Sequence, residues 1–305
     1  MIFMHGMNRF SRLAFLSLFF SCSAIPYSPH SPGVESSQIF DSLLTTGTRL
    51  DVDINGSVVL VDGEKNTVRL LSKDIKRTAE IGGSGWGDDQ FDHPSGVWAR
   101  NGIDIFIADY GNHRIQRFDR KLAFISSLST RGRANPDERF GYPTDVAVSR
   151  LGDLFICDSE NSRIVKVVGL SKIEKTFGGF DAGKGRLKKP NQLEIGPHDN
   201  VYVQDAMPDA KQGSRVVVFD NFGNFIHIIG ESLFPDGVQI YADENGLILL
   251  GGGKLFFFDE NDRPELTVEL DSVTIKAARS FVFSRGVAYF LTSQGLVVIP
   301  DPRKQ

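Results

Sequence analysis

The stretch that decides the fold reads Phe140-Gly-Tyr-Pro143-Thr-Asp-Val-Ala-Val148 and, after three residues, Gly152-Asp-Leu-Phe-Ile-Cys-Asp158-Ser-Glu-Asn161-Ser-Arg163-Ile-Val165. An earlier copy reads Phe91-Asp-His-Pro94-Ser-Gly-Val97 and then Ile105-Phe-Ile-Ala-Asp109-Tyr-Gly-Asn112-His-Arg114-Ile-Gln-Arg-Phe118-Asp119. One such unit cannot bury its apolar face alone. Repeated copies therefore indicate an architecture in which the units pack against one another.

The period of the repeat follows from the acidic residue that closes its second apolar run. This residue recurs at steps of 47, 49 and 47 residues, as Asp62, Asp109, Asp158 and Asp205. Within each period, short apolar or alternating runs are separated by Gly, Asn and Asp, which is typical of strands joined by tight turns. Two degraded copies follow, from position 234 to 259 and from 280 to 299. Six copies of this length predict an all-β, six-bladed β-propeller with four antiparallel strands in each blade.

The motif Pro-x-x-Val, an apolar triplet ending in Asp, and Asn-x-Arg-Ile-x-x-Phe resembles the NHL repeat. The resemblance is fullest over Phe91–Asp119 and Phe140–Val165, extends to Leu50–Leu71 and Leu187–Phe225, and weakens after Phe234. It implies a TolB-like, six-bladed propeller. It does not imply a reaction, because the family includes RNA-binding and protein-binding modules as well as a few lyases and lactonases.

Composition agrees with one large propeller. The 305 residues include 31 Gly and 24 Phe, and 41% of them are hydrophobic, which is enough to bury a large core. We expect residues 37–305 to form a single domain that acts as a monomer and needs no cofactor. The net charge of −4 and the pI of about 5.9 give no overall basic field, so nucleic acid is disfavoured as a partner.

The N-terminus resembles an export signal. The basic segment Met7–Arg12 precedes the apolar run Leu13–Phe20, which is too short to span a bilayer. Residues 1–24 are therefore interpreted as the signal and residues 25–36, rich in Pro and Ser, as a linker. The sequence leaves open whether translation begins at Met1 or at Met7.

The end of the apolar run resembles a bacterial lipoprotein signal. In that reading Cys22 is acylated and becomes the first residue of the mature chain, although Phe19 and Phe20 stand where such signals usually have Leu and a small residue. Cleavage after Ala24 would instead release a soluble exported protein. We expect a lipoprotein anchored to a membrane of the bacterial cell envelope, with the soluble exported form as the alternative.

Charged pairs recur in the copies. They are Asp109 with Arg114, Asp158 with Arg163, and Asp205 with Arg215. Such pairs either form a ring that grips a ligand or hold the blades together, with Asp accepting backbone N–H bonds and Arg bridging to the carboxylate. We favour the structural role, because a residue that recurs in every blade is explained by what every blade needs. Functional residues are expected where the copies differ.

Long variable loops are expected on one face of the propeller, the long-loop face, where the second strand joins the third and one blade joins the next. Tight turns are expected on the opposite, short-loop face. The long loops cover positions 82–90, 131–138, 178–189 and 206–213. Function often lies on loops held by a rigid scaffold, so this face is the predicted binding face. Its residues Trp86, Tyr110 and Phe180 are of a type enriched at interfaces.

At the centre of the long-loop face, the residues that follow the repeat Pro are expected to ring the mouth of a channel. The predicted ligand-binding residues there are Thr144, Asp145, Asn191, Gln192 and Asp236, with Ser95 and Arg49 beside them. The lyase branch of the resemblance has zinc-binding His near these positions, which are not His here. The lactonase branch holds calcium with oxygen ligands, a chemistry open to Asp145, Asn191 and Asp236. We expect an ordinary solvated channel and no metal.

Two other features receive the simpler interpretation. Cys157 lies within an apolar run, where it is expected to fill space in a strand and not to act as a reactive thiol. The basic loop at positions 184–189 has only Phe180 as a nearby aromatic platform, so RNA binding is disfavoured. The loop fits a solvated face, or one that meets anionic lipid or envelope polysaccharide.

The last copy raises the question of ring closure. It ends at Pro300 and Pro302 after a third strand, because Pro cannot donate to a strand ladder. Propellers avoid the exposed edge by taking a strand from the other end of the chain. We predict that residues 37–44 supply it.

These features together predict a non-catalytic binding or scaffolding module. Its long-loop face would recognise a protein or a cell-envelope glycan. The alternative is a metal-dependent lactonase or other hydrolase, or a lyase, with its site at the channel mouth.

Overall fold

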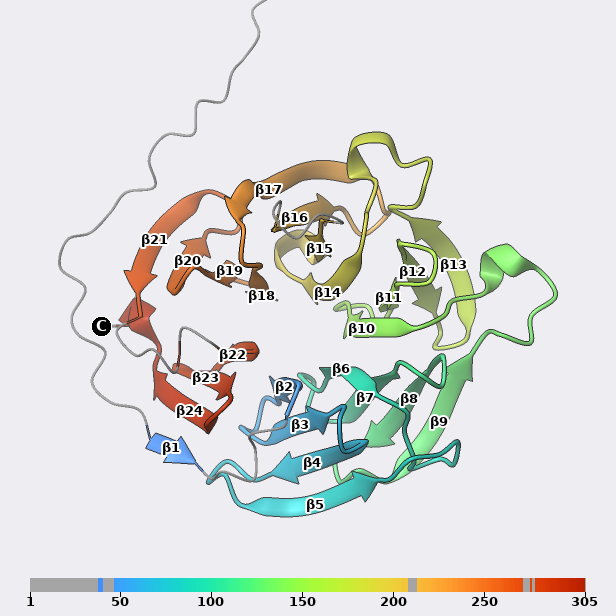
Figure 1. The fold of residues 1–305 in the computed structure, drawn as a ribbon, viewed down its shortest axis with the longest axis horizontal. Helices are drawn as coiled ribbons and strands as arrows, with labels where there is room; N and C mark the ends of the chain where they lie inside the picture. The colour runs from blue at the N-terminus through green and yellow to red at the C-terminus, as the bar shows by residue number, and fades with distance from the viewer. Residues whose placement is uncertain (1–37, 41–46, 208–212, 271–274, 276–277, 305) are drawn as a thin grey trace, which may run out of the picture.

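The computed structural model describes residues 38–40, 47–207, 213–270, 275 and 278–304. Within these residues, the strands form six sheets of four antiparallel strands, arranged around a common centre (Figure 1). The predicted all-β, six-bladed propeller with four-stranded blades is therefore confirmed.

The blades follow one another along the chain, and the first strand of each lies nearest the centre (Figure 1). Blade one contains β2 (Arg49–Val52), β3 (Val58–Asp62), β4 (Thr67–Leu71) and β5 (Arg77–Gly82). Blade two contains β6 (Pro94–Trp98), β7 (Asp104–Asp109), β8 (Arg114–Asp119) and β9 (Phe124–Ser129). Blade three contains β10 (Pro143–Val148), β11 (Leu154–Asp158), β12 (Arg163–Val168) and β13 (Lys172–Phe177).

The second half of the ring repeats this order. Blade four contains β14 (Pro190–Ile195), β15 (Val201–Ala206), β16 (Ser214–Phe219) and β17 (Phe225–Phe234). Blade five contains β18 (Gln239–Asp243), β19 (Gly246–Gly251), β20 (Lys254–Phe258) and β21 (Pro264–Glu269). Blade six contains β22 (Ser280–Ser284), β23 (Val287–Thr292), β24 (Gly295–Pro300) and β1 (Gln38–Phe40). Short 3₁₀ helices are η2 (Pro136–Glu138), η3 (Gly183–Gly185), η4 (Pro197–Asp199) and η6 (Pro302–Lys304).

The core lies between the blades. Every residue of β3, β11 and β19 is buried, whereas the outer strands β5 and β9 contain no fully buried residue. A strand whose two faces are both covered reads as a continuous apolar run, which explains sequences such as Leu-Phe-Ile-Cys in β11. Cys157 is fully buried there, as expected.

Ring closure takes place in blade six. Strand β1 pairs with β24 in antiparallel register, with Gln38 opposite Val298 and Phe40 opposite Leu296. Figure 1 shows β1 at the outer side of β24. The predicted contribution of the N-terminal segment to the last blade is confirmed, and it covers an edge that would otherwise expose unpaired backbone groups.

The predicted signal at residues 1–24, its acylation site Cys22 and the linker at residues 25–36 lie outside the described residues. Among the residues that are described, no helix has the length and apolar character needed to cross a membrane.

Deleting residues 36–45 is expected to lower the thermal midpoint by about 10 °C or more, or to cause aggregation, because β24 becomes an exposed edge. Differential scanning calorimetry and light scattering measure the two outcomes. Deleting residues 26–35 removes the same number of residues without touching β1, and should leave the midpoint nearly unchanged. Equal midpoints for both deletions would show that β1 does not close the ring.

Candidate functional site on the long-loop face

The register of the first two strands brings the repeat Pro and the repeat Asp together. Pro94 is opposite Asp109 in blade two, and Pro143 is opposite Asp158 in blade three. Both residues therefore lie at the end of the blade from which the long loops emerge. The tight turns lie at the other end, as in the turn where Gly102 adopts a φ of +68°.

The recurring Asp and Arg residues form buried ion pairs. The Arg Nε to Asp Oδ2 distances are 2.8 Å for Arg114–Asp109, 2.9 Å for Arg163–Asp158 and 3.1 Å for Arg215–Asp205. The other carboxylate oxygen accepts a backbone N–H from the residue two before the repeat Pro. These donors are Asp92 N at 2.8 Å, Gly141 N at 3.1 Å and Lys188 N at 2.8 Å.

The same Arg side chains also hold the loops between blades. Their terminal nitrogens donate to backbone carbonyls of the preceding inter-blade loop at 2.8–3.1 Å: Trp86, Gly87 and Gln90 in blade two, Asp137 and Arg139 in blade three, and Arg186 in blade four. Each Arg thus connects the buried carboxylate of its blade with the backbone of a long loop.

Burial raises the pKa of Asp109 and Asp158 above the usual value for a carboxyl. Hydrogen bonds from backbone N–H groups, from the neighbouring Asn and from the paired Arg oppose this effect, because each favours the ionised form. Charge-assisted bonds of this kind make the pairs strong anchors for the loops.

Aromatic side chains are exposed on the loops that these pairs hold. Trp86 is 69% exposed and Phe180 is 75% exposed. The Arg186 guanidinium lies 4.2 Å from the centroid of the Phe180 ring. Tyr110 is partly buried, and its ring lies 5.1 Å from that of Tyr142.

Tyr142 was not among the predicted site residues, although its ring packs against Tyr110 on the long-loop face. Its ring packs edge-on against His113 at 4.1 Å, and Arg131 lies 5.9 Å from its centroid. Tyr142 and His93 each directly precede a repeat Pro and adopt positive φ values of 47° and 52°. An aromatic residue at this position of the repeat is therefore the signal that points to Tyr142.

The channel-mouth residues separate into two groups. Asp145 and Gln192 are each only 3% exposed and bind the inner strand of the next blade. Asp145 Oδ2 accepts Leu193 N at 3.1 Å. Gln192 donates to the carbonyl of Ile240 at 2.6 Å and accepts its N–H at 3.1 Å. These two side chains act as contacts between blades.

Burial raises the pKa of Asp145 to about 6, although Arg49 and two backbone N–H donors favour its ionised form. Arg49 lies 3.5 Å from its carboxylate. Thr144 Oγ1 donates to the carbonyl of Pro190 at 3.4 Å. Thr144 therefore also connects neighbouring blades.

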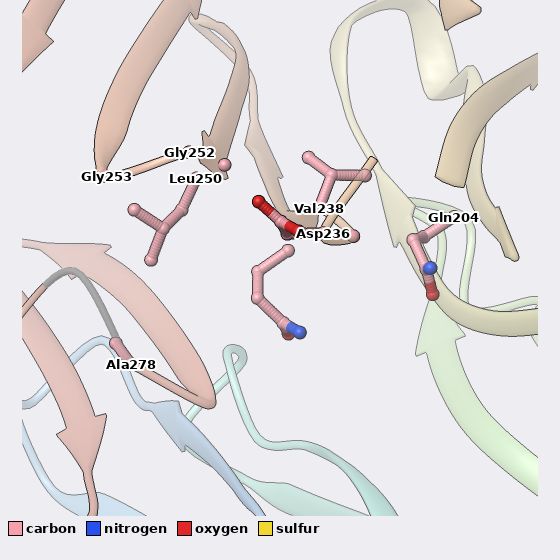
Figure 2. A pocket seen from close by; sticks show the side chains of 10 residues that line it. Gln204, Asp236, Val238, Leu250, Gly252, Gly253 and Ala278 are labelled. Carbon is pink, nitrogen blue, oxygen red and sulfur yellow. The ribbon is translucent and has the colours of Figure 1, made fainter. Parts of the chain in front are cut away.

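Asn191 and Asp236 form the second group, since both are exposed. Asp236 lines a cavity of about 540 Å³ between blades four, five and six (Figure 2). Of the three candidate calcium ligands, Asp145 is thus buried between blades whereas Asn191 and Asp236 are exposed. Among the described residues, no three His, Cys, Asp or Glu side chains gather in a way that could hold a metal ion.

A polar cluster that the sequence did not indicate lies at the short-loop end of the channel. Arg100, in the turn after β6, reaches Asp51 at 3.2 Å, Glu194 at 2.6 Å and the carbonyl of Ala242 at 2.6 Å. Its guanidinium also lies 4.6 Å from the ring centroid of Tyr241. The space left among these inner strands is only about 10 Å³. Arg100 thus connects blade two with blades one, four and five.

Arg100→Met is expected to destabilise the fold by about 2 kcal/mol at pH 8 and by less at pH 5. The value lies below the ~3–5 kcal/mol of a fully buried pair, because the Arg100 side chain is 23% exposed. Burial raises the pKa of Glu194 to about 8, and losing Arg100 raises it further. An acid whose pKa is raised on folding loses stability as the pH rises from its unfolded value through its folded value.

Urea denaturation of both proteins at pH 5 and pH 8 measures the effect of Arg100→Met. Arg120→Met removes an exposed Arg instead and should change stability little at either pH. An equal loss for Arg100→Met at both pH values would contradict a role in compensating buried carboxylates.

Known proteins match parts of this chain. Residues 140–167, from just before β10 to β12, match the family model described as "NHL repeat". The third blade carries an NHL repeat. The match falls on the region where the sequence resemblance was fullest.

Two curated relatives match over longer parts of the chain. "Protein brain tumor" of Drosophila melanogaster is 29% identical over 144 residues, which are 46% of this chain and 13% of that protein. "Probable peptidyl-alpha-hydroxyglycine alpha-amidating lyase" of Caenorhabditis elegans is 32% identical over 103 residues, which are 33% of this chain and 28% of that protein. This chain thus spans less than a third of the length of either relative.

Solved structures share the propeller fold. A virginiamycin B lyase from Staphylococcus aureus superposes with a TM-score of 0.58 and 15% identity, over 87% of this chain and 88% of that one. A gluconolactonase from Xanthomonas campestris superposes with a TM-score of 0.55 and 12% identity, over 92% and 99% of the two chains. At such low identity these likenesses establish the fold alone.

Proposed function

We propose that this protein is a non-catalytic binding or scaffolding module that recognises a protein or glycan partner with its long-loop face. The observation that carries the proposal is the pairing of exposed aromatic side chains with immobilised loop backbones. Trp86 and Phe180 are 69% and 75% exposed, yet the Trp86 carbonyl accepts a hydrogen bond from the buried Arg114.

Aromatic anchors on a fixed backbone suit recognition for two reasons. Trp, Tyr and Arg carry much of the binding energy at interfaces, because they bury large areas on contact. A backbone that is already ordered loses less conformational entropy when the partner binds.

The carboxylates of the inner channel already have partners within the protein, which supports recognition outside the channel. Asp51 and Asp145 accept hydrogen bonds from the adjacent blades, and Glu194 pairs with Arg100. These carboxylates have structural partners, and little space remains between them. The proposed partner therefore binds the long-loop face and does not enter this inner part of the channel.

We propose a position in the bacterial cell envelope, with a lipid anchor at Cys22. The motif around Cys22 and the length of the apolar run before it support this location. A protein or polysaccharide of the envelope would then be the available partner.

Replacing Trp86 and Tyr110 together by Ala is expected to weaken partner capture at least about tenfold and to shift the thermal midpoint by less than about 2 °C, because neither side chain fills a blade core. Pull-down from an envelope extract measures the capture. Protease treatment of the extract beforehand separates a protein partner, which would be lost, from a glycan, which would remain.

Phe222→Ala provides the matched control for this test. Phe222 is 70% exposed, like Trp86, but lies between β16 and β17 on the short-loop face. Its loss should leave capture unchanged. Equal capture by the wild-type protein and by the Trp86 and Tyr110 variant would contradict recognition by the long-loop face.

Acylation gives a second test. Labelled palmitate fed to cells should enter the wild-type protein and be absent from Cys22→Ala, because a lipoprotein signal acylates that thiol and stable anchoring needs more than one hydrocarbon chain. Cys157→Ala keeps the signal intact and controls for labelling of a second thiol. Label of equal strength in Cys22→Ala would contradict the anchor.

A metal-dependent lactonase or other hydrolase, or a lyase, is the second candidate. It is favoured by the cavity of about 540 Å³ beside Asp236 at the channel mouth, on a fold that such enzymes also use. The test is turnover of a lactone. If chelators abolish this turnover, calcium restores it and Asp236→Asn removes it, the protein is this enzyme and the binding-module proposal is wrong.

A further inference from the structure

Blade five departs from the repeat where the Asp–Arg pair would stand. Gly251 and Lys254 face each other across β19 and β20, in the register that Asp205 and Arg215 occupy in blade four. A Cβ on Gly251 would lie 2.6 Å from the Phe234 ring, so a side chain does not fit there. Lys254 instead pairs with Glu269 at 2.8 Å.

The cavity of about 540 Å³ lies at this position. Figure 2 shows Asp236 at its centre, between Leu250 and Gln204, with Gly252 and Gly253 at the rim. Its volume falls within the range of about 300–1,000 Å³ that is usual for small-ligand sites. Blade five thus lacks the structural pair and offers space at the position of that pair.

Gln204 contributes to the cavity wall a buried acceptor to which no described residue donates. Gln204 is only 6% exposed, and its Nε2 donates to Ser214 Oγ at 3.0 Å. Its Oε1 is buried, and none of the residues that the structure describes donates to it. A buried acceptor without a donor costs about 1–3 kcal/mol, so this oxygen favours a ligand that donates.

Charge points to the same kind of ligand. Asp236 is exposed, and no Lys or Arg is among the described residues that line the cavity. The field of its carboxylate attracts a cation and repels phosphates and carboxylates. Gln239 adds a side-chain amide that can accept a further N–H.

The remaining wall is apolar. Val238 and Leu250 are 3% and 4% exposed and line the cavity together with Ala278. Such a wall suits a chain of methylene groups, which Lys and Arg pack against apolar surfaces while their charged ends meet polar groups.

We propose that this cavity binds an alkyl ammonium or alkyl guanidinium group, with the cation at Asp236, N–H donors directed to Gln204 Oε1, and the methylene stem against Val238 and Leu250. The proposal rests on the proposed function, and it specifies what the partner presents to this face. A Lys or Arg side chain of a protein partner and a free amine share this chemistry.

Calorimetric titration with four probes tests the cavity. The probes are N-acetyl-lysine methylamide, N-acetyl-arginine methylamide, the free amine agmatine, and N-acetyl-norleucine methylamide, which keeps the stem without the charge. Saturable binding of at least one cationic probe, with norleucine at least tenfold weaker, is expected. Tighter binding of the capped residues than of agmatine identifies a partner side chain as the source, and the reverse order identifies a free amine.

Two variants place the binding at this cavity. Asp236→Asn keeps the shape of the exposed side chain and should weaken the cationic probes at least tenfold. Asp88→Asn removes an exposed carboxylate from another loop of the same face and should leave their affinity unchanged. The amide resonances of Gly252 and Gly253 should shift on titration of the wild-type protein.

The proposal is overturned if norleucine binds as tightly as lysine, if Asp236→Asn binds the cationic probes like the wild type, or if only calcium chloride binds at Asp236. Partner capture decides the other claim separately. If capture depends on Trp86 and Tyr110 while no cationic probe binds, the binding module stands and the cavity proposal falls. If the probes bind and partner capture does not depend on Trp86 and Tyr110, the cavity proposal stands and the binding-module proposal falls.

Discussion

The antiparallel pairing of β1 with β24 is the contact on which the ring depends. Each blade covers the apolar faces of its two neighbours, so an open ring would leave two blades with exposed cores. Blade six has only three strands from its own part of the chain, and its fourth comes from residues 38–40. Residues from the two ends of the propeller thus meet in one sheet, and the other five blades keep their positions through this closure.

Side chains at the inner strands connect the blades around the channel. Asp51 binds Ala99 N at 2.8 Å, Asp145 binds Leu193 N at 3.1 Å, and Gln192 binds Ile240, in each case 48 residues further along the chain. The polar groups at the channel therefore satisfy backbone donors that the inner edge of each sheet leaves unpaired. This use of the carboxylates supports a recognition surface formed by the loops and not by the channel.

The buried Asp–Arg pairs link the framework to that surface. In each pair, the Arg donates hydrogen bonds to the carboxylate inside the blade and to backbone carbonyls of the loop that enters the blade. The fold and the shape of the loops therefore depend on the same side chain. Blade five has Gly251 in place of the acid, and a cavity takes the space. In blade five, loss of the pair thus leaves room for a site beside the repeated framework.

The sequence by itself determined the repeat, the strands, the number of blades and the closure by the N-terminal segment, because turns and apolar runs are local signals and a six-fold repeat restricts their arrangement. It also located Trp86 on a long loop. Only the tertiary structure decided which polar residues contact other blades, as Asp145 does by accepting a hydrogen bond from Leu193 N. Arg100 meets Glu194 and Ala242 across 94 and 142 residues, and no local pattern encodes such contacts, because they arise only when the ring closes.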